Sequence, residues 1–391
     1  SEVAGVPELG ATGRGEHMEV GTYIGKALTS ELSGNMIDLC PVGALTNSPY
    51  AFNARPWELK KTESFDVTDA IGSNIRIDAR GPEVKRILPR LNEDVNEEWI
   101  SDKARFSCDG LKNQRLDTPY IRHDGKLTKA TWQEAFSAIA DVLKPLQGEQ
   151  IAAIAGDMAD CESMTLLKEL MYLLGSENID CRQDGAKIDP TTRAGYLFNS
   201  TISGIDHADA ILLLGTNPRR EAPVLNARIR KRYVAGGIRI ASIGDDVDLT
   251  YPYENLGNNV SILKNLSVGK GDFAKILKSA EHPMLIIGQG ALSRNDGAAI
   301  LDLARTTADK LGMIDENKGW NGFNLLHTAA ARVGGLDLGF VPGSNGRDVA
   351  SILEGAESGD IKAVYLLGAD EINTLKLNDC FVIYQGHHGD V

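Results

Sequence analysis

Ala210-Ile211-Leu212-Leu213-Leu214-Gly215-Thr216-Asn217-Pro218 is the stretch of sequence that decides the fold. Its apolar run has the length of a strand, and the glycine and proline that follow it end the run. A strand without polar alternation is buried on both faces, which is typical of a parallel sheet covered by helices on both sides. The stretch therefore predicts an α/β domain.

The same pattern recurs along the rest of the chain. Further apolar strands are predicted at 151–155, 238–243, 284–287 and 363–367. Helices are predicted around 225–233, 296–312 and 347–356, a capping box at 131–134 opens a helix to about 146, and leucines between 166 and 174 form an apolar helical stripe. Strands that alternate with helices predict doubly wound parallel sheets of the α/β class.

Each predicted strand ends at a glycine, namely Gly156, Gly215, Gly244, Gly288 or Gly368. In open α/β sheets ligands bind outside the carboxyl ends of the strands, where glycine lets the backbone approach a ligand closely. Glycine also allows a chain simply to leave a strand sharply, and the residues favour this second interpretation. The chain has no G-x-G-x-x-G motif with a following acidic residue and no Walker A motif.

Two smaller parts precede the α/β domain. Residues 1–60 are rich in glycine and poor in periodicity, so we expect a metal cluster or a partner to hold them together. Residues 74–80 alternate polar and apolar, Gly81-Pro82 turns the chain, and 84–88 return as a second strand. The predicted domains are thus 1–60, a small antiparallel unit at 61–115, and the α/β domain at 116–391.

Composition narrows the class of protein. A chain of 391 residues has room for two or three domains, and a net charge of −13 argues against nucleic acid as a partner. No run approaches the roughly 18 apolar residues of a membrane span, so direct membrane insertion is not expected. The five cysteines are scattered, which indicates a reducing compartment. The start at Ser1, with neither a signal sequence nor an initiator methionine, suggests a chain that begins in mid-sequence.

Cys40 is the candidate metal ligand. It lies in Asp38-Leu39-Cys40-Pro41-Val42-Gly43-Ala44-Leu45. In two-cluster ferredoxins the fourth ligand of each [4Fe–4S] cluster is a cysteine followed directly by proline. The amides of such a turn can hydrogen-bond to cluster sulfides. A lone cysteine is otherwise often a small buried hydrophobe, so the turn alone leaves both interpretations open.

The surrounding sequence resembles the large iron–sulfur subunit of respiratory NADH–quinone oxidoreductase (complex I) of the mitochondrial or alphaproteobacterial type. The resemblance covers nearly the whole chain. It rests on residues 12–15, 20–24, 30–35, 62–64, 96–103, 215–219, 226–231, 247–251, 294–300 and 384–391.

That resemblance implies electron relay from the flavin-bearing, NADH-binding subunit toward the quinone-side iron–sulfur subunits. It implies a peripheral location, on the matrix side of the mitochondrial inner membrane or the cytoplasmic side of a bacterial one. It also implies a ferredoxin-like N-terminal part with one [2Fe–2S] and two [4Fe–4S] clusters. Residues 1–60 would be the remnant of that part, with Cys40 as the fourth ligand of the last [4Fe–4S] cluster. The other three ligands are expected just before Ser1.

The α/β part resembles formate dehydrogenase and other molybdopterin oxidoreductases, through residues 115–122, 124–126 and 132–135. Gly215-Thr216-Asn217-Pro218 resembles a pterin-dinucleotide loop, but no thiol or hydroxyl stands near Ala186-Lys187, where the resemblance implies the metal ligand. It also implies four cluster cysteines in the antiparallel unit. Here those positions read Asp66, Asp69, Ser73 and Ser101, which are poor ligands for a cluster built on soft thiolates. We therefore expect neither that cluster nor molybdopterin.

The remaining candidates are interpreted as structural. No second Cys or His stands at ligand spacing from Cys108, Cys161 or Cys380, and Cys181 does not have the spacing of the implied metal ligand. His387-His388 follows a strand end, where a ligand could bind, but lacks an acidic partner in a known geometry. The basic run Arg228, Arg230, Lys231 and Arg232 is predicted to be a solvated helix face, with docking of an acidic subunit as the alternative.

Three hypotheses follow. The first is a piece of the complex I subunit in which Cys40 is a cluster ligand, the α/β part is a scaffold, and the isolated chain is inert in NADH oxidation. The second is a molybdopterin-dependent oxidoreductase related to formate dehydrogenase. The third is a structural module without a cofactor.

Overall fold

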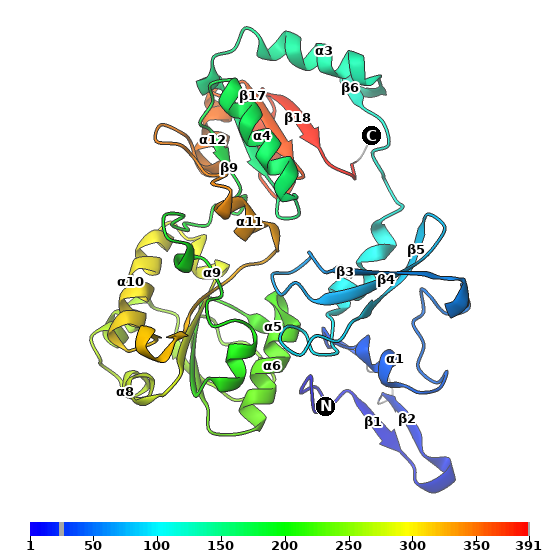
Figure 1. Ribbon diagram of the computed structural model, residues 1–391, viewed down its shortest axis with the longest axis vertical. Coiled ribbons are helices and arrows are strands. Elements are labelled where there is room, and N and C mark those ends of the chain that lie inside the picture. The colour runs from blue at the N-terminus through cyan, green and yellow to red at the C-terminus, as the bar shows by residue number, and fades with distance from the viewer. Residues whose placement is uncertain (23–26, 390–391) are drawn as a thin grey trace. The chain divides into compact units, whose positions relative to one another are not determined.

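The computed structural model describes residues 1–22 and 27–389. Parts of two of the segments named above, at 23–24 and 390–391, lie outside the described residues. Contacts within the chain group it into two units, Ser1–Asp109 with Ala194–Thr328, and Gly110–Arg193 with Ala329–Val391 (Figure 1). No helix of the described residues is both long and apolar enough to cross a membrane.

The first unit is built on a parallel sheet with the strand order β12-β11-β10-β13-β16. Its strands are β10 (Ala210–Leu214), β11 (Arg239–Ile243), β12 (Glu254–Gly257), β13 (Pro283–Gly288) and β16 (Phe323–Leu326). The helices are α5 (Pro218–Glu221), α6 (Pro223–Val234), α7 (Val260–Ser267), α8 (Asp272–Ser279), α9 (Gln289–Leu292) and α10 (Gly297–Lys310), and β14 (Ile314–Asp315) pairs with β15 (Trp320–Asn321).

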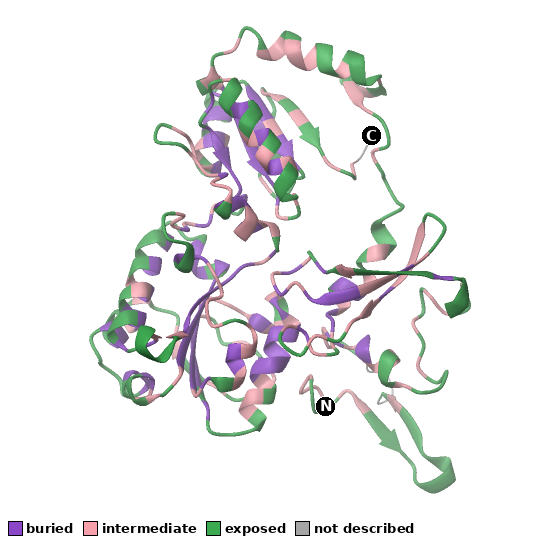
Figure 2. Ribbon diagram, in the orientation of Figure 1, coloured by how far each residue is buried: buried purple, intermediate pink, exposed green. Residues whose placement is uncertain are grey.

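The order of this sheet reverses at β10. The chain proceeds from β10 to β11 and β12 on one side, and then returns to the other side for β13 and β16. Both β10 and β13 are buried along their whole length (Figure 2). Ile211 and Leu213 of β10 belong to one core with Leu225 and Ile229 of α6. The predicted doubly wound α/β fold is confirmed.

The N-terminal part of the same unit contains a hairpin, a short helix and an antiparallel sheet. Its elements are β1 (Leu9–Thr12), β2 (Glu19–Thr22), α1 (Asn35–Leu39), β3 (Lys60–Phe65), β4 (Asn74–Arg80), β5 (Glu83–Pro89) and α2 (Asp102–Phe106). Strands β3, β4 and β5 form the sheet, and Gly81-Pro82 is the turn between the last two, as predicted. Ile75, Ile87, Ile100 and Ala104 pack α2 against this sheet.

The second unit has a parallel sheet with the order β18-β17-β8-β9. Its elements are β6 (Tyr120–His123), β7 (Lys126–Lys129), α3 (Trp132–Leu143), β8 (Ile151–Ala155), α4 (Cys161–Leu173), β9 (Ile179–Asp180), α11 (Ala331–Asp337), α12 (Val349–Ser358), β17 (Ala363–Leu367) and β18 (Phe381–Gln385). The capping box that opens α3 is confirmed, since Thr131 and Glu134 bond to each other's backbone amides.

The leucine stripe predicted on α4 faces the sheet only in part. Met164, Leu167 and Met171 are buried, whereas Leu166 and Leu173 are exposed. The spacing of three and four residues between the buried side chains defines the inward face of the helix. Methionines, which the leucine pattern did not include, therefore supply most of that face.

Three of the strand-ending glycines are required by contacts within the protein. A Cβ on Gly215, which has a positive φ, would collide with Ala291. A Cβ on Gly156 would collide with the carbonyl oxygen of Gly368, and a Cβ on Gly288 would collide with Thr216 and Gly215. These glycines let the turns of neighbouring strands touch. At these positions the close approach that glycine permits is therefore to another turn of the protein itself.

Candidate functional site

Cys40 lies directly after the last turn of α1. Its amide donates to the carbonyl oxygen of Met36 at 3.1 Å, and the residue has extended backbone angles, so the helix ends there. Pro41 follows and cannot continue the helical hydrogen bonding. The side chain is half-buried, and the Cys-Pro turn that follows is largely exposed.

The backbone of the turn favours the thiolate form of Cys40. The neutral thiol can donate to the carbonyl oxygen of Val42, 3.1 Å from Sγ. Hydrogen bonds that the sulfur receives from the backbone at Val42, Leu45 and Ala44 stabilise the thiolate instead. They lower the pKa of the thiol below its ordinary value. Because the thiolate is the form that binds metal, this surrounding suits a ligand.

A buried arginine holds the helix that carries Cys40. Arg105 of α2 donates to both carboxylate oxygens of Asp38, at 2.5 and 3.2 Å, and to Oδ1 of Asn35 at 3.2 Å. Asn35 also exchanges hydrogen bonds with the backbone of Ile100 at 2.8 and 3.1 Å. A side chain on Gly34 would collide with Arg105, so glycine is needed there. The cysteine is thus fixed to the antiparallel unit.

The segment just before α1 is fixed to the α/β sheet of the same unit. The carboxylate of Glu31 pairs with Arg219 at 3.1 Å and with Arg220 at 3.0 Å. Leu32 packs against Val224 and Ala227 of α6. These contacts bring the N-terminal segment onto the turn that follows β10.

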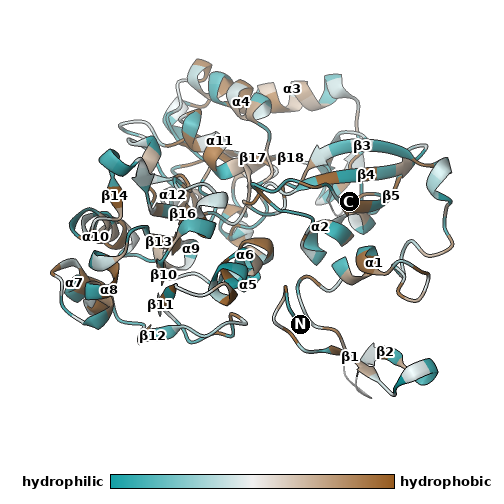
Figure 3. Cartoon of the chain, turned by 60° about the horizontal axis from the view of Figure 1, so that its bottom comes forward, coloured by the Kyte–Doolittle hydropathy of each residue, from teal (hydrophilic) through white to brown (hydrophobic). Residues whose placement is uncertain are grey.

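The basic run on α6 makes similar contacts, and its interpretation as a solvated face was wrong for Arg228, whereas Lys231 is exposed as predicted. Arg228 is buried, pairs with Asp206 at 2.6 Å and donates to the carbonyl oxygen of Glu93 at 2.9 Å. Lys231 pairs with Glu97. Hydrophobic and hydrophilic residues alternate around α6 (Figure 3), because one face packs on the sheet while the charged face meets other parts of the unit.

The other two members of the basic run on α6 bond to backbone carbonyl oxygens. Arg230 donates to Glu2 and Thr250, and Arg232 donates to Ala208 and Gly236. The guanidinium groups of α6 therefore satisfy backbone acceptors within the unit.

Four buried oxygen-bearing residues occupy the positions considered for a second cluster: Asp66, Asp69, Ser73 and Ser101. Asp66 accepts from the amide of Thr68 at 3.1 Å, and Ser101 caps α2 by accepting from the amide of Ala104 at 3.1 Å. These bonds shape the loop between β3 and β4 and the start of α2.

Asp69 is a weaker acid than an ordinary aspartate. Its Oδ1 accepts from the amide of Ile71 at 2.9 Å. Burial, reinforced by the nearby carboxylate of Asp66, raises the pKa of Asp69 to about 6. The backbone bond and the ammonium group of Lys103 oppose this increase without cancelling it.

A cleft of about 430 Å³ opens at the carboxyl edge of the sheet in the first unit. The turns after β10, β11, β12 and β13 form its walls. Its polar lining includes Thr216, Asn217, Glu221, Asp245, Asn258 and Arg294. It lies where the strand order reverses, the usual position of ligands in doubly wound sheets.

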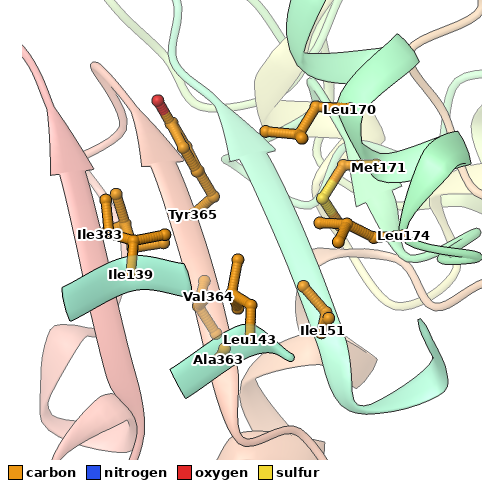
Figure 4. Close-up of a pocket in the computed structure, with 10 residues that line it drawn as sticks. All are labelled: Ile139, Leu143, Ile151, Leu170, Met171, Leu174, Ala363, Val364, Tyr365 and Ile383. Carbon is orange, nitrogen blue, oxygen red and sulfur yellow. The ribbon is translucent and has the colours of Figure 1, made fainter. Parts of the chain in front are cut away.

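A smaller cavity lies in the second unit, between α3, α4 and the sheet (Figure 4). Its volume is about 30 Å³, and apolar side chains such as Leu143, Leu170 and Ile383 line it. A cavity of this size and lining has room for no more than about one water molecule and no polar partners for it.

Three family models match consecutive parts of the chain. Residues 1–46 match NADH-quinone oxidoreductase subunit 3, ferredoxin-like domain, and residues 59–109 match NADH-ubiquinone oxidoreductase NDSU1/NuoG-like, 4Fe-4S domain. Residues 115–391, more than half of the chain, match the molybdopterin oxidoreductase model. The chain belongs to the molybdopterin oxidoreductase family.

Curated relatives show which proteins this chain resembles along its whole length. The G subunit of NADH-quinone oxidoreductase from Rickettsia bellii is 51% identical over 391 residues, which is 100% of this chain and 56% of the relative. The corresponding protein of Rickettsia prowazekii is 50% identical over the same shares. The resemblance to the large iron–sulfur subunit of complex I is confirmed, and the chain spans little more than half the length of these relatives.

A solved structure supports the fold. Acetylene hydratase from Pelobacter acetylenicus matches with a TM-score of 0.60 over 84% of this chain and 61% of its own chain. At 12% sequence identity this likeness shows the shared fold alone.

The residues of the first unit fit one ligand of an iron–sulfur cluster. Within residues 1–22 and 27–389, no three His, Cys, Asp or Glu side chains are arranged to hold a metal ion. Cys40, with its lowered pKa, can supply one thiolate. The buried oxygens of Asp66, Asp69, Ser73 and Ser101 do not fit a cluster that prefers thiolates, and three of these residues, Asp66, Asp69 and Ser101, already accept hydrogen bonds from backbone amides.

The resemblance to molybdopterin oxidoreductases implies a metal ligand near Ala186-Lys187, but the residues there do not fit that cofactor. Ala186 is buried and carries no donor, and Lys187 pairs with Asp348 at 2.9 Å. Burial, reinforced by Asp180, raises the pKa of the nearby Cys181 to about 12, so its thiol is in the neutral form. No step of a reaction is therefore assigned to this group.

The remaining candidates, Cys161, Cys380, His387 and His388, belong to the second unit. Cys161 is exposed, and the thiol of Cys380 lies 3.1 Å from the carbonyl oxygen of Ile361. His388 bonds to the carbonyl oxygen of Gly110 at 3.1 Å, and the carbonyl oxygen of His387 accepts from the amide of Leu116. The histidine pair thus ties the end of the described chain to residues 110–116 of its own unit.

Sequence reasoning did not identify Glu31, Arg105, Arg219 or Glu221. Glu31 and Arg219 lay within segments that carried the family resemblance, and Arg105 closely follows one. No local pattern distinguishes a buried arginine from an exposed one, because its partners lie far away in sequence.

Proposed function

We propose that this chain is part of an electron-relay subunit of an NADH–quinone oxidoreductase, in which Cys40 supplies one thiolate to a [4Fe–4S] cluster. The observation that carries the proposal is the placement of Cys40. Its thiol has a lowered pKa and stands at the end of a short helix that Arg105 fixes to the antiparallel unit. When bound, the cluster would supply one-electron redox chemistry.

The complete subunit is proposed to hold one [2Fe–2S] and two [4Fe–4S] clusters, with the other ligands of the Cys40 cluster on residues that this sequence does not contain. Its partners would be the flavin-bearing, NADH-binding subunit and the quinone-side iron–sulfur subunits. Its location would be peripheral, on the matrix or cytoplasmic side of the respiratory membrane. The similarity of this chain to the G subunits of the two Rickettsia proteins supports a place in such an oxidoreductase.

The α/β part would serve as the scaffold for the cluster segment. Glu31 and Leu32, just before α1, contact the turn and the helix that follow β10. Arg228 and Lys231 of the same helix bind the backbone of Glu93 and the side chain of Glu97, and so hold this segment against the helix. A rigid scaffold benefits electron transfer, because a ligand held in one geometry needs little rearrangement when the charge of its cluster changes.

The test replaces Cys40 with alanine in the full-length subunit within the assembled oxidoreductase. Electron paramagnetic resonance of the reduced enzyme is expected to show one reducible [4Fe–4S] centre fewer than in the wild type. Cys161→Ala is the matched control, since Cys161 is exposed and far from Cys40 in sequence. An unchanged number of reducible centres in C40A refutes the ligand assignment and favours a structural module.

The isolated chain is proposed to be inert in NADH oxidation, because it offers one cluster thiolate and no complete set of ligands among the described residues. The purified chain can be assayed with NADH and an artificial electron acceptor. Turnover above the background rate would contradict the scaffold assignment.

A further inference from the structure

The turn after β10 is the part of the cleft where an anion would be expected. In doubly wound sheets the amides of the first strand–helix turn bind the phosphates of a ligand. Here that turn begins at Gly215, which has a positive φ of 56°, and continues through Thr216 and Asn217 into α5. Its donors face the position where the strand order reverses.

An acidic side chain of the same chain already occupies these donors. Glu221, at the end of α5, folds back over the turn. Its Oε1 accepts from the amide of Asn217 at 2.6 Å, and its Oε2 accepts from the hydroxyl of Thr216 at 2.9 Å. The two carboxylate oxygens thus take the place that two oxygens of a phosphate would occupy.

The cations beside the cleft are also engaged. Arg219 pairs with Glu31 at 3.1 Å and with Asp248 at 2.6 Å. Arg294 pairs with Asp296 through two bonds of 2.7 and 3.0 Å. The carboxylate of Asp245 lines the cleft as well, so its walls have little positive charge to offer a phosphate.

We propose that Glu221 is a built-in anionic ligand of the β10 turn, which closes this cleft to phosphate-bearing molecules. Its negative charge repels an incoming anion, and its oxygens satisfy the donors that the anion would need. Removal of the side chain uncovers the amide of Asn217 and the hydroxyl of Thr216, and so converts the turn into an anion site. The alternative is that Glu221 merely caps a short helix, in which case its removal uncovers no binding site.

Inorganic pyrophosphate is the probe, and the full chain is titrated by isothermal calorimetry at constant ionic strength. The wild type is expected to show no saturable binding at millimolar pyrophosphate. Glu221→Ala is expected to bind it saturably in the millimolar range, and to melt at a higher temperature in its presence. Glu221→Gln loses the charge but keeps an acceptor for the amide of Asn217, so it is expected to bind more weakly than E221A. Glu169→Ala, which removes an exposed carboxylate on α4, is the charge-matched control and should not bind.

Three results overturn the proposal. Binding by the wild type shows that Glu221 does not close the cleft. Absence of binding in both E221A and E221Q shows that the carboxylate is only a cap. Equal binding by E221A and E169A assigns the effect to net charge. If E221A does not fold, E221Q decides the question, because its amide preserves the shape of the turn, and a lack of binding by this variant refutes the proposal.

Discussion

Arg105 and Asp38 form a two-pronged ion pair that joins α2 to the helix carrying Cys40. The bonds measure 2.5 Å from Nη2 to Oδ2 and 3.2 Å from Nη1 to Oδ1. The Arg105 side chain is 1% exposed and that of Asp38 is 29% exposed. Because Asp38 lies two residues before Cys40, the pair fixes the Cys-Pro turn to the antiparallel unit.

Arg105→Leu is expected to lower the free energy of unfolding by about 3 kcal/mol. The substitution leaves the carboxylate of Asp38 and the amide oxygen of Asn35 without their charged donor, and losing one partner of a buried pair is costly. Urea denaturation measures the change. Arg14→Leu is the matched control, because Arg14 is exposed, and it is expected to change stability by less than about 0.5 kcal/mol. Equal effects of the two variants would contradict the role of the ion pair.

Glu31 and Arg219 are expected to be energetically coupled. Their side chains are 15% and 14% exposed, and the pair joins the segment before α1 to the turn after β10. A double-mutant cycle of Glu31→Gln and Arg219→Gln is expected to give a coupling energy of about 1–2 kcal/mol, since both charges are largely shielded from water. Urea denaturation of the four proteins provides the measurement. Additive effects would show that the contact does not stabilise the N-terminal segment.

Asp69→Asn is expected to stabilise the protein above pH 6 and to have little effect near pH 4. Burial raises the pKa of Asp69 in the folded protein to about 6, above its ordinary value of 3.8. The stability that its proton contributes is therefore fully present below pH 3.8 and is lost as the pH rises through 6. Asparagine is always neutral and can still accept from the amide of Ile71. The expected gain at pH 8 is about 1–3 kcal/mol.

Thermal or urea unfolding from pH 4 to pH 8 tests this dependence. Asp94→Asn, an exposed change in the same unit, is the control and should leave the pH profile unchanged. A variant of Asp69 that is less stable than the wild type at pH 8 would show that the ionised carboxylate is needed, for instance by Lys103.

Cys40 is expected to react with iodoacetamide at least about a hundredfold faster than Cys181 in the folded chain, because the thiolate is the nucleophile. The backbone around Cys40 lowers its pKa, whereas burial raises the pKa of Cys181 to about 12. Burial also raises the pKa of Cys380, which should react slowly. Peptide mapping by mass spectrometry after timed labelling at pH 8 measures the rates. Similar rates for Cys40 and Cys181 would contradict the lowered pKa of the first thiol and the raised pKa of the second.

The alternation of apolar strands and helices made the parallel sheets predictable. An all-apolar run such as Ala210–Leu214 can be satisfied only between two covering layers. The Cys-Pro turn made Cys40 the candidate ligand, because proline and the amides of the turn are local features. The leucine stripe on α4 was only partly correct, since a helix of mixed leucine and methionine offers more than one apolar face.

Sequence by itself determined the class of fold, the family resemblance and the candidacy of Cys40, all of which depend on neighbours along the chain. Only the tertiary structure decided which charges are buried and what they bind. Arg105 meets Asp38 across 67 positions, Arg219 meets Glu31 across 188, and Arg228 meets the backbone of Glu93 across 135. A charged residue has the same local sequence signature whether it faces water or a distant carboxylate. Its partner is chosen by the packing of the unit, because a charge removed from water must find an opposite charge or a hydrogen-bonding group nearby.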